Sequence, residues 1–204
     1  MTNSSGVSDA GLEASKRALR AQVAAMLPQP GSEAHADACR RALQRLSESP
    51  AVAAAARIAI YRALPSEVAT LDATAKLLAA GKDVFFPALV EGARVLRFLR
   101  AHGRLSRGAL GVEEPEDLPS ARVPLEAIEL FVIPALAVDA NGHRLGRGKG
   151  YYDATLTAAG PRARRVVLVF DAQLVERVPV AGHDERMDAI CTDARWLELP
   201  ERNS

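Results

Sequence analysis

A glycine- and arginine-rich loop between an apolar run and a helix start constrains the fold of this chain more than any other stretch. Residues 132–138 are apolar apart from Pro134, and β-branched side chains among them favour a buried strand. Residues 139–142 form a turn signal, because Asn and Gly tolerate positive φ angles. Residues 146–150 then read G-R-G-K-G, and a helix is expected over residues 151–159.

This loop has the composition of a phosphate-binding site. Alternate glycines let the backbone fold tightly and turn its N–H groups toward one point. The helix that follows adds unpaired N–H groups and the positive end of its dipole. Arg144, Arg147 and Lys149 add full positive charges, which together suit a polyphosphate. Asp153, just inside the helix, is placed to hold a divalent cation on that phosphate.

The loop does not match the two commonest phosphate-binding patterns. No Ser or Thr follows Lys149, so it is not a Walker A loop, and the glycine spacing differs from that of the dinucleotide fingerprint. A solvated hairpin loop whose cations bind nothing is the alternative interpretation of the pattern alone.

The amino-acid sequence of the loop closely resembles the signature of a known family. R-L-G-R-G-K-G-Y-Y-D, after V-D-x-N-G, resembles the 5-formyltetrahydrofolate cyclo-ligase family, also called 5,10-methenyltetrahydrofolate synthetase. Other pieces follow in the family's order: K-R-x-L-R at 16–20, S-E-V-x-T at 66–70, G-K-D-V-F-F-P at 81–87, G-V-x-E-P at 111–115, V-F-D-A-Q at 169–173 and H-D-E-R-M-D at 183–188. The resemblance runs from about residue 16 to residue 192. It departs at Leu96, where the family commonly has methionine and where leucine would equally serve as an apolar wall.

The resemblance implies an enzyme that uses ATP and Mg²⁺ to close 5-formyltetrahydrofolate to 5,10-methenyltetrahydrofolate, through a phosphorylated formyl group. The ATP-binding residues that it implies are Lys16, Arg20, Arg144, Leu145, Gly146, Arg147, Gly148, Lys149, Gly150, Tyr151 and Tyr152. The implied folate-binding residues are Arg20, Glu67, Arg147, Gly148, Lys149, Gly150 and Tyr151. Arg147, Lys149 and Tyr151 are the expected catalytic residues, and Asp153 and Asp188 the expected magnesium ligands.

Each of these residues also has an interpretation without a ligand. Lys16 and Arg20 lie four apart on a helix and would ordinarily be solvated. Glu67 would be favoured near a helix N-terminus by the dipole alone. Asp188, close to His183 and Asp184, would ordinarily belong to a capping and turn network.

Two other functions stay open at this stage. The chain has no G-x-S-x-G or Cys–His motif, so it offers no protein nucleophile, and the expected chemistry needs none. A non-catalytic folate or nucleotide binder on the same scaffold is one alternative. A different ATP-dependent enzyme that reuses the phosphate loop is the other.

Composition narrows the class of protein. The chain has 204 residues, of which 49% are hydrophobic and 25% charged, as is ordinary for a globular protein. Its net charge of +1 does not indicate nucleic acid or an anionic membrane as a partner. Cys39 and Cys191 lie far apart, which disfavours a disulfide scaffold or a zinc site. We find no signal sequence and no apolar run long enough to span a bilayer, so a cytoplasmic protein is expected, with no obligatory protein partner.

Short apolar runs alternate with helical patterns, which predicts one three-layer α/β/α domain with a mostly parallel, partly mixed sheet. We expect a disordered tail over residues 1–11 and the domain over residues 12–200. The expected helices cover residues 9–26, 32–48, 66–80 and 151–159, and the expected strands residues 57–61, 82–87, 94–100, 132–138, 166–170 and 189–192. The arginines at 162, 164 and 165 are expected on a solvated face, and the acidic residues between 113 and 117 at the surface.

Overall fold

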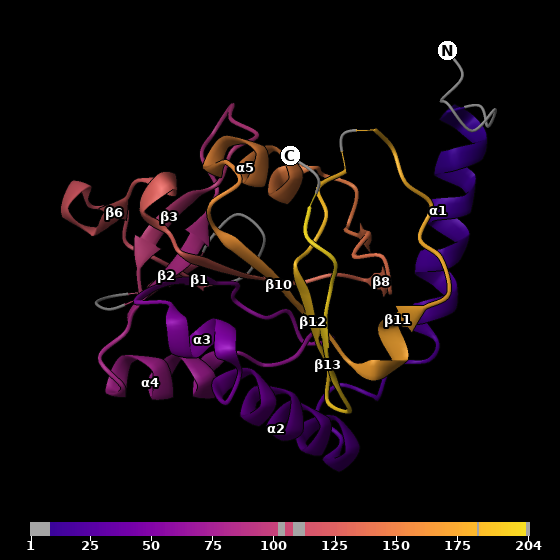
Figure 1. The fold of residues 1–204 in the computed structure, drawn as a ribbon, viewed down its shortest axis with the longest axis horizontal. Coiled ribbons are helices and arrows are strands. Elements are labelled where there is room, and N and C mark those ends of the chain that lie inside the picture. Colours follow the sequence, from indigo (N-terminus) through magenta and orange to yellow (C-terminus); the bar gives the residue numbers. More distant parts are fainter. Residues whose placement is uncertain (1–8, 102–104, 108–112, 183, 203–204) are drawn as a thin grey trace.

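An eight-stranded mixed sheet forms the centre of the computed structural model, which describes residues 9–101, 105–107, 113–182 and 184–202 (Figure 1). Its strands, in spatial order, are β13 (Trp196–Glu198), β12 (Ala189–Cys191), β10 (Arg164–Leu168), β7 (Leu130–Ile133), β1 (Arg57–Ile60), β2 (Asp83–Ala88), β3 (Arg97–Arg100) and β6 (Arg122–Val123). The five strands from β12 to β2 are parallel, and the outer strands pair antiparallel. The predicted mostly parallel, partly mixed sheet is confirmed.

The central strands are buried on both faces. In β1, Ile58 and Ile60 face one hydrophobic core, while Ala59 between them faces the other. This two-residue alternation is the geometry of a strand, and near-continuous apolar sequence is what a parallel sheet covered on both faces requires.

Helices cover the two faces and make three layers. Helices α2 (Glu33–Ser47), α3 (Pro50–Ala54) and α4 (Leu71–Ala79) lie on one face, and α5 (Tyr151–Ala159) lies on the other (Figure 1). Ser32 and Ser49 cap α2 and α3 with their hydroxyl groups, which accept hydrogen bonds from backbone N–H groups in the first turns. The α/β/α architecture expected from the sequence is therefore present.

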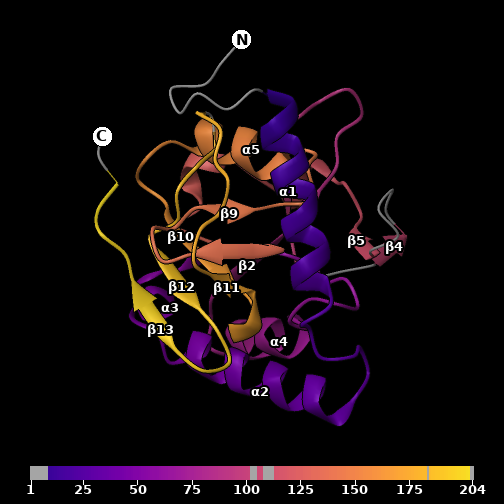
Figure 2. The same ribbon diagram turned by 90° about the vertical axis from the view of Figure 1, so that its right-hand side faces the viewer.

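A small second sheet carries the start of the glycine loop. It orders β11 (Leu174–Val175), β8 (Ala137–Asp139) and β9 (Arg144–Leu145), with β8 and β9 forming a hairpin whose turn residue Gly142 has φ = 82°. Helix α1 (Asp9–Ala24) packs on this sheet through Val23, which shares a hydrophobic cluster with Ala137 and Leu145 (Figure 2). The first helix is thus held beside the loop that follows β9.

The remaining elements are short. They are the β4 (Leu105–Arg107) and β5 (Glu113–Pro115) hairpin and the 3₁₀ turns η1 (Pro119–Ala121), η2 (Leu125–Ala127) and η3 (Asp171–Gln173). None of the described helices is long and apolar enough to cross a membrane.

The single strand expected over residues 132–138 is wrong. The chain leaves the large sheet after β7, passes through residues 134–136 and enters the small sheet as β8. Pro134 has no N–H to give to the strand ladder, which ends the pairing there. Gln173, almost fully buried, holds the connection by donating from Nε2 to the carbonyl oxygens of Ala135 and Leu136.

The helix expected from Ser66 begins later, at Leu71. Residues 64–67 form a turn instead, closed by a hydrogen bond from the Glu67 amide to the Leu64 carbonyl oxygen. The Thr70 hydroxyl donates to the Tyr61 carbonyl oxygen at 2.6 Å rather than capping the helix. Glu67 therefore lies in the loop after β1 and not in the first turn of a helix. The helix dipole cannot explain its position.

Two further expectations need correction. Residues 9–11 belong to α1 and not to a disordered tail, while residues 1–8 lie outside the described part. Arg165 is buried rather than solvated, because its guanidinium bonds Glu185 and the carbonyl oxygens at the end of α5. Within the acidic stretch, Asp117 lies at the surface as expected. It forms ion pairs with Arg122 and Arg97, and the hydrogen bond from Arg122 foremost lowers the pKa of its carboxyl group.

Candidate active site

A pocket of about 480 Å³ opens where the central strands end. Strand β1 pairs with β2 on one side and with β7 on the other. The chain connections that follow these strands therefore leave the centre of the sheet in opposite directions. Such a switch point creates a crevice at the carboxyl ends of parallel strands, where open α/β sheets bind ligands. The pocket is lined by residues that follow or end these three strands, among them Glu67, Leu89 and Leu136.

The glycine loop forms one wall of the pocket. Gly148 and Gly150 have φ angles of 88° and 69°, which L-residues with side chains rarely adopt. Gly150 is the N-terminal cap residue of α5, and its carbonyl oxygen accepts the first intrahelical hydrogen bond, from the amide of Ala154. The amides of the first turn have no intrahelical partner, so this wall presents N–H groups and a positive dipole end, as the sequence predicted.

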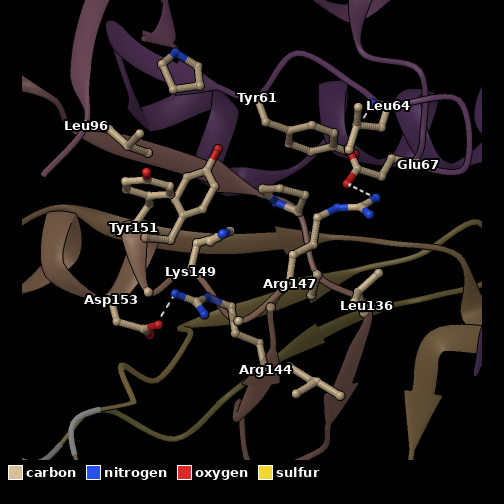
Figure 3. Close-up of a pocket in the computed structure, with 18 of the residues that line it drawn as sticks. Tyr61, Leu64, Glu67, Leu96, Leu136, Arg144, Arg147, Lys149, Tyr151 and Asp153 are labelled. Atoms are coloured by element: carbon tan, nitrogen blue, oxygen red, sulfur yellow. Dashed lines mark hydrogen bonds and ion pairs between the residues drawn. The ribbon is translucent and has the colours of Figure 1, made fainter. Parts of the chain in front are cut away.

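Arg144 and Asp153 form a largely buried ion pair in this wall. Arg144 Nη2 donates to Asp153 Oδ1 at 2.8 Å, and the two side chains are 4% and 17% exposed (Figure 3). Asp153 Oδ1 also accepts from the amide of Glu185 at 3.2 Å. Its second oxygen, Oδ2, accepts no hydrogen bond from the described residues.

The other two loop cations differ in their partners. Arg147 Nη2 donates to Glu67 Oε1 at 3.1 Å, and Glu67 Oε2 accepts from the amide of Leu64 at 2.9 Å (Figure 3). Lys149 is exposed to the pocket and makes no ion pair with any residue in the described ranges. Its ammonium group is thus available to an anionic ligand.

Helix α1 brings two more cations to the loop. Lys16, largely buried, pairs with Asp184 at 3.1 Å. Arg20 donates from Nε to the Gly146 carbonyl oxygen at 3.2 Å, and a Cβ on Gly148 would lie 3.3 Å from Arg20 Nη2. Both side chains line the pocket, so their interpretation as a solvated pair is wrong.

Aromatic and aliphatic side chains complete the pocket. Burial, together with the nearby Glu67 carboxylate, raises the pKa of the Tyr61 and Tyr152 phenols, which therefore stay neutral. Tyr61 donates its hydroxyl proton to the Val68 carbonyl oxygen at 3.0 Å and is a structural residue. Tyr151 and Leu96 lie on the opposite side of the pocket from Glu67 (Figure 3). A flat, partly apolar ligand fits between such walls.

The structure brings all but one of the expected site residues into this pocket. The exception is Asp188, whose Oδ2 accepts from the amide of Arg165 at 2.8 Å and whose Oδ1 pairs with Arg202 at 2.6 Å. It lines a second, shallow depression instead. Among the described residues, no group of three or more His, Cys, Asp or Glu side chains is placed to hold a metal ion, and His183 lies outside those residues.

Sequence reasoning missed several residues that line the pocket. Arg62 lies over the Phe86 ring, 5.2 Å from its centroid, and Asp184 meets Lys16. Residues 134–136 form part of the lining as well. Ligands in open α/β sheets bind at the carboxyl ends of parallel strands, and this rule could have identified these loops. Applying it requires the order of the strands in the sheet, which the sequence alone does not give.

Comparison with known proteins agrees with the geometry of the pocket. The model of the 5-formyltetrahydrofolate cyclo-ligase family matches residues 12–193. The chain belongs to this family. It is therefore an enzyme of the cyclo-ligase type, and the resemblance seen in the sequence is confirmed.

Two bacterial cyclo-ligases illustrate the relationship. The 5-formyltetrahydrofolate cyclo-ligase of Mycolicibacterium smegmatis is 34% identical over 141 residues, which cover 65% of this chain and 70% of that protein. The enzyme of the same name from Escherichia coli K12 is 31% identical over 163 residues, covering 78% of this chain and 90% of that protein.

Solved structures share the fold of this cyclo-ligase family member. The NMR structure of Aquifex aeolicus 5,10-methenyltetrahydrofolate synthetase aligns with a TM-score of 0.76 and 25% identity, over 93% of this chain and 95% of that one. A synthetase from Mycoplasma pneumoniae aligns with a TM-score of 0.68 over 87% of this chain and 98% of that one, at 20% identity.

Proposed function

We propose that this enzyme converts 5-formyltetrahydrofolate and ATP into 5,10-methenyltetrahydrofolate, ADP and phosphate. The observation that carries the proposal is the convergence of the glycine loop, the α5 N-terminus and Lys149 on one pocket that also has apolar and aromatic walls. The cationic wall suits a triphosphate, and the remaining walls suit a flat folate ring.

The chemistry explains why a cation-rich pocket without a nucleophile suffices. The formyl oxygen attacks the γ-phosphorus of ATP, the bond to ADP breaks, and N5 donates its electron pair to give an iminium phosphate. N10 of the same folate then attacks the formyl carbon and loses its proton. Departure of phosphate, which carries the formyl oxygen away, leaves the methenyl group between N5 and N10. The protein must align these atoms and stabilise the charge.

The residues of the pocket divide between these tasks. Lys149 and Arg147, which line the pocket, would stabilise the transferred phosphoryl group, and the amides of the glycine loop would bind the remaining phosphates. Glu67 would accept hydrogen bonds from the pterin amino and ring N–H groups, and Tyr151 would contact the formyl end of the folate. Lys16 and Arg20 would close the phosphate side from α1.

Magnesium fits this site through one carboxylate. Asp153 Oδ2 accepts no hydrogen bond from the described residues, and Mg²⁺ commonly takes one or two protein carboxylates together with substrate phosphates. When bound, the ion would neutralise negative charge on the nucleotide. Asp153 is our proposed ligand, whereas Asp188 faces Arg202 outside the pocket.

An absorbance assay for the methenyl product tests this function. Purified protein, 5-formyltetrahydrofolate and Mg²⁺ are combined with and without ATP, and growth of the near-ultraviolet methenyl band is followed. ATP-dependent growth with matching ADP release is the expected result. Folate binding by folded protein without ATP consumption would overturn the proposal and favour a non-catalytic binder.

A further inference from the structure

Glu185 connects the magnesium side of the pocket to the far end of helix α5. Its carboxylate is held on both oxygens: Thr157 Oγ1 donates to Oε1 at 2.7 Å, and Arg165 Nη1 donates to Oε2 at 2.5 Å. Its backbone amide donates to Asp153 Oδ1 at 3.2 Å. One residue therefore links the proposed magnesium ligand to a later turn of its own helix, α5, and to β10.

Arg165 makes this anchor rigid. Its side chain is 4% exposed, and Nη2 donates to the carbonyl oxygens of Leu156 and Gly160 at 3.0 and 3.2 Å. These carbonyls lie at the C-terminal end of α5, where the dipole favours a cation. The amide of Arg165 is itself fixed by Asp188. The Glu185 carboxylate is thus bound to a guanidinium that cannot move without releasing the helix end.

This anchor has two consequences in the pocket. Asp153 Oδ1 is occupied by Arg144 and by the Glu185 amide, which fixes the carboxylate with Oδ2 remaining for a cation. Asp184, the adjacent residue, pairs with Lys16 of α1. Release of Glu185 would therefore disturb both the proposed magnesium ligand and the contact that holds Lys16 at the pocket.

We propose that Glu185 is a positioning residue for the magnesium–nucleotide side of the site, acting through Asp153 and the Asp184–Lys16 pair. This inference rests on the proposed function, because it takes Asp153 as the magnesium ligand. Residues that orient a metal ligand without touching the metal typically change metal affinity or activity by about 10- to 100-fold when they are replaced. A merely structural ion pair would change stability alone.

The test compares Glu185→Ala and Glu185→Gln with a matched control. Glu198→Gln removes a similar carboxylate, which pairs with Arg164, the neighbour of Arg165 on β10, and neither Glu198 nor Arg164 lines the pocket. We expect the half-saturating Mg²⁺ concentration and the KM for ATP to rise about tenfold in Glu185→Ala, with the KM for folate unchanged. Glu198→Gln should match the parent protein in all three.

Binding without turnover separates this inference from the proposed function. Mg²⁺-dependent ATP binding to each variant is measured by calorimetry, alongside thermal unfolding. Weaker Mg²⁺-dependent binding in a folded Glu185 variant supports the positioning role, even if the parent protein forms no methenyl product. If Glu185→Ala does not fold, the same binding measurement on Glu185→Gln, which keeps the size of the side chain, tests the inference. Parental Mg²⁺ and ATP binding in a folded variant would overturn the inference.

Discussion

Arg147 Nη2 lies 3.1 Å from Glu67 Oε1, so a residue of the glycine loop is bound to a residue of the loop after β1 (Figure 3). The family resemblance implied ATP and folate binding for Arg147 and folate binding for Glu67. The two side chains satisfy each other across the pocket. If Glu67 binds the pterin as proposed, Arg147 would be released toward the phosphates, and binding of the two substrates would be coupled.

Replacing Glu67 with Gln should weaken folate binding selectively. The amide has one acceptor oxygen and no charge, so it cannot accept two parallel hydrogen bonds from a pterin. We expect the KM for folate to rise about 10- to 100-fold, the equivalent of the ~1.5–3 kcal/mol typical of a hydrogen bond to a charged group. The KM for ATP should not rise, because Arg147 is released. Steady-state kinetics beside Glu91→Gln, an exposed carboxylate outside the pocket, checks this.

Replacing Lys149 with Ala should reduce turnover far more than folate binding. Its ammonium makes no ion pair within the described residues, so the loss falls on the charge that develops during phosphoryl transfer. We expect kcat to fall about 10²- to 10³-fold. Rapid-mixing turnover and folate titration provide the two measurements. Similar losses in kcat and folate affinity would contradict the assignment, while Lys149→Arg, which keeps the charge, should be intermediate.

Local features of the site were predictable because short-range chemistry determines them. Gly148 and Gly150 have the positive φ angles that alternate glycines suggested, and α5 covers Tyr151–Ala159 as expected. The strand before the loop was predicted wrongly. We expected one strand over residues 132–138 even though Pro134 lies within it. A proline ends pairing within one sheet, but only the tertiary structure shows that the chain then joins a second sheet.

Long-range partners were beyond the reach of the sequence. Glu67 and Arg147 are 80 residues apart in the chain, and Asp188 meets Arg202 rather than Asp153. Arg165 was expected on a solvated face because arginine is usually exposed. Its burial depends on Glu185 and on the end of α5, which come together only when β10 is in the sheet.

Replacing Asp153 with Asn should destabilise the protein as well as weaken magnesium binding. Arg144 is 4% exposed, and its Nε already has no hydrogen-bond partner among the described residues. Loss of the carboxylate leaves a buried charge uncompensated, which typically costs about 3–5 kcal/mol. Denaturant unfolding should show this loss. The double variant Arg144→Met with Asp153→Asn should recover much of it, and equal stability of parent and Asp153→Asn would contradict the prediction.

The stability contributed by Glu129 should depend on pH. Its carboxylate accepts from the amides of Ala56 and Arg57 at 2.6 and 3.1 Å and from the Arg57 guanidinium at 2.8 Å. These hydrogen bonds, the two amides foremost, lower the pKa of Glu129 below its ordinary 4.5. A carboxyl group whose pKa is lower in the folded state stabilises the fold above the unfolded pKa, and that contribution disappears as the pH falls through the folded pKa.

Glu129→Gln should therefore lower the free energy of unfolding at pH 7 and not at strongly acidic pH. The side chain is 38% exposed, so solvent screening limits the difference to about 0.5–1 kcal/mol. Urea unfolding of both proteins from pH 7 down to pH values below 4.5 measures it. Glu126→Gln, an exposed neighbour without such partners among the described residues, should behave as the parent throughout. The prediction would be contradicted if Glu129→Gln lowered the free energy of unfolding equally at pH 7 and at acidic pH. The shape of the side chain, and not its charge, would then account for the stability that it adds between β1 and β7.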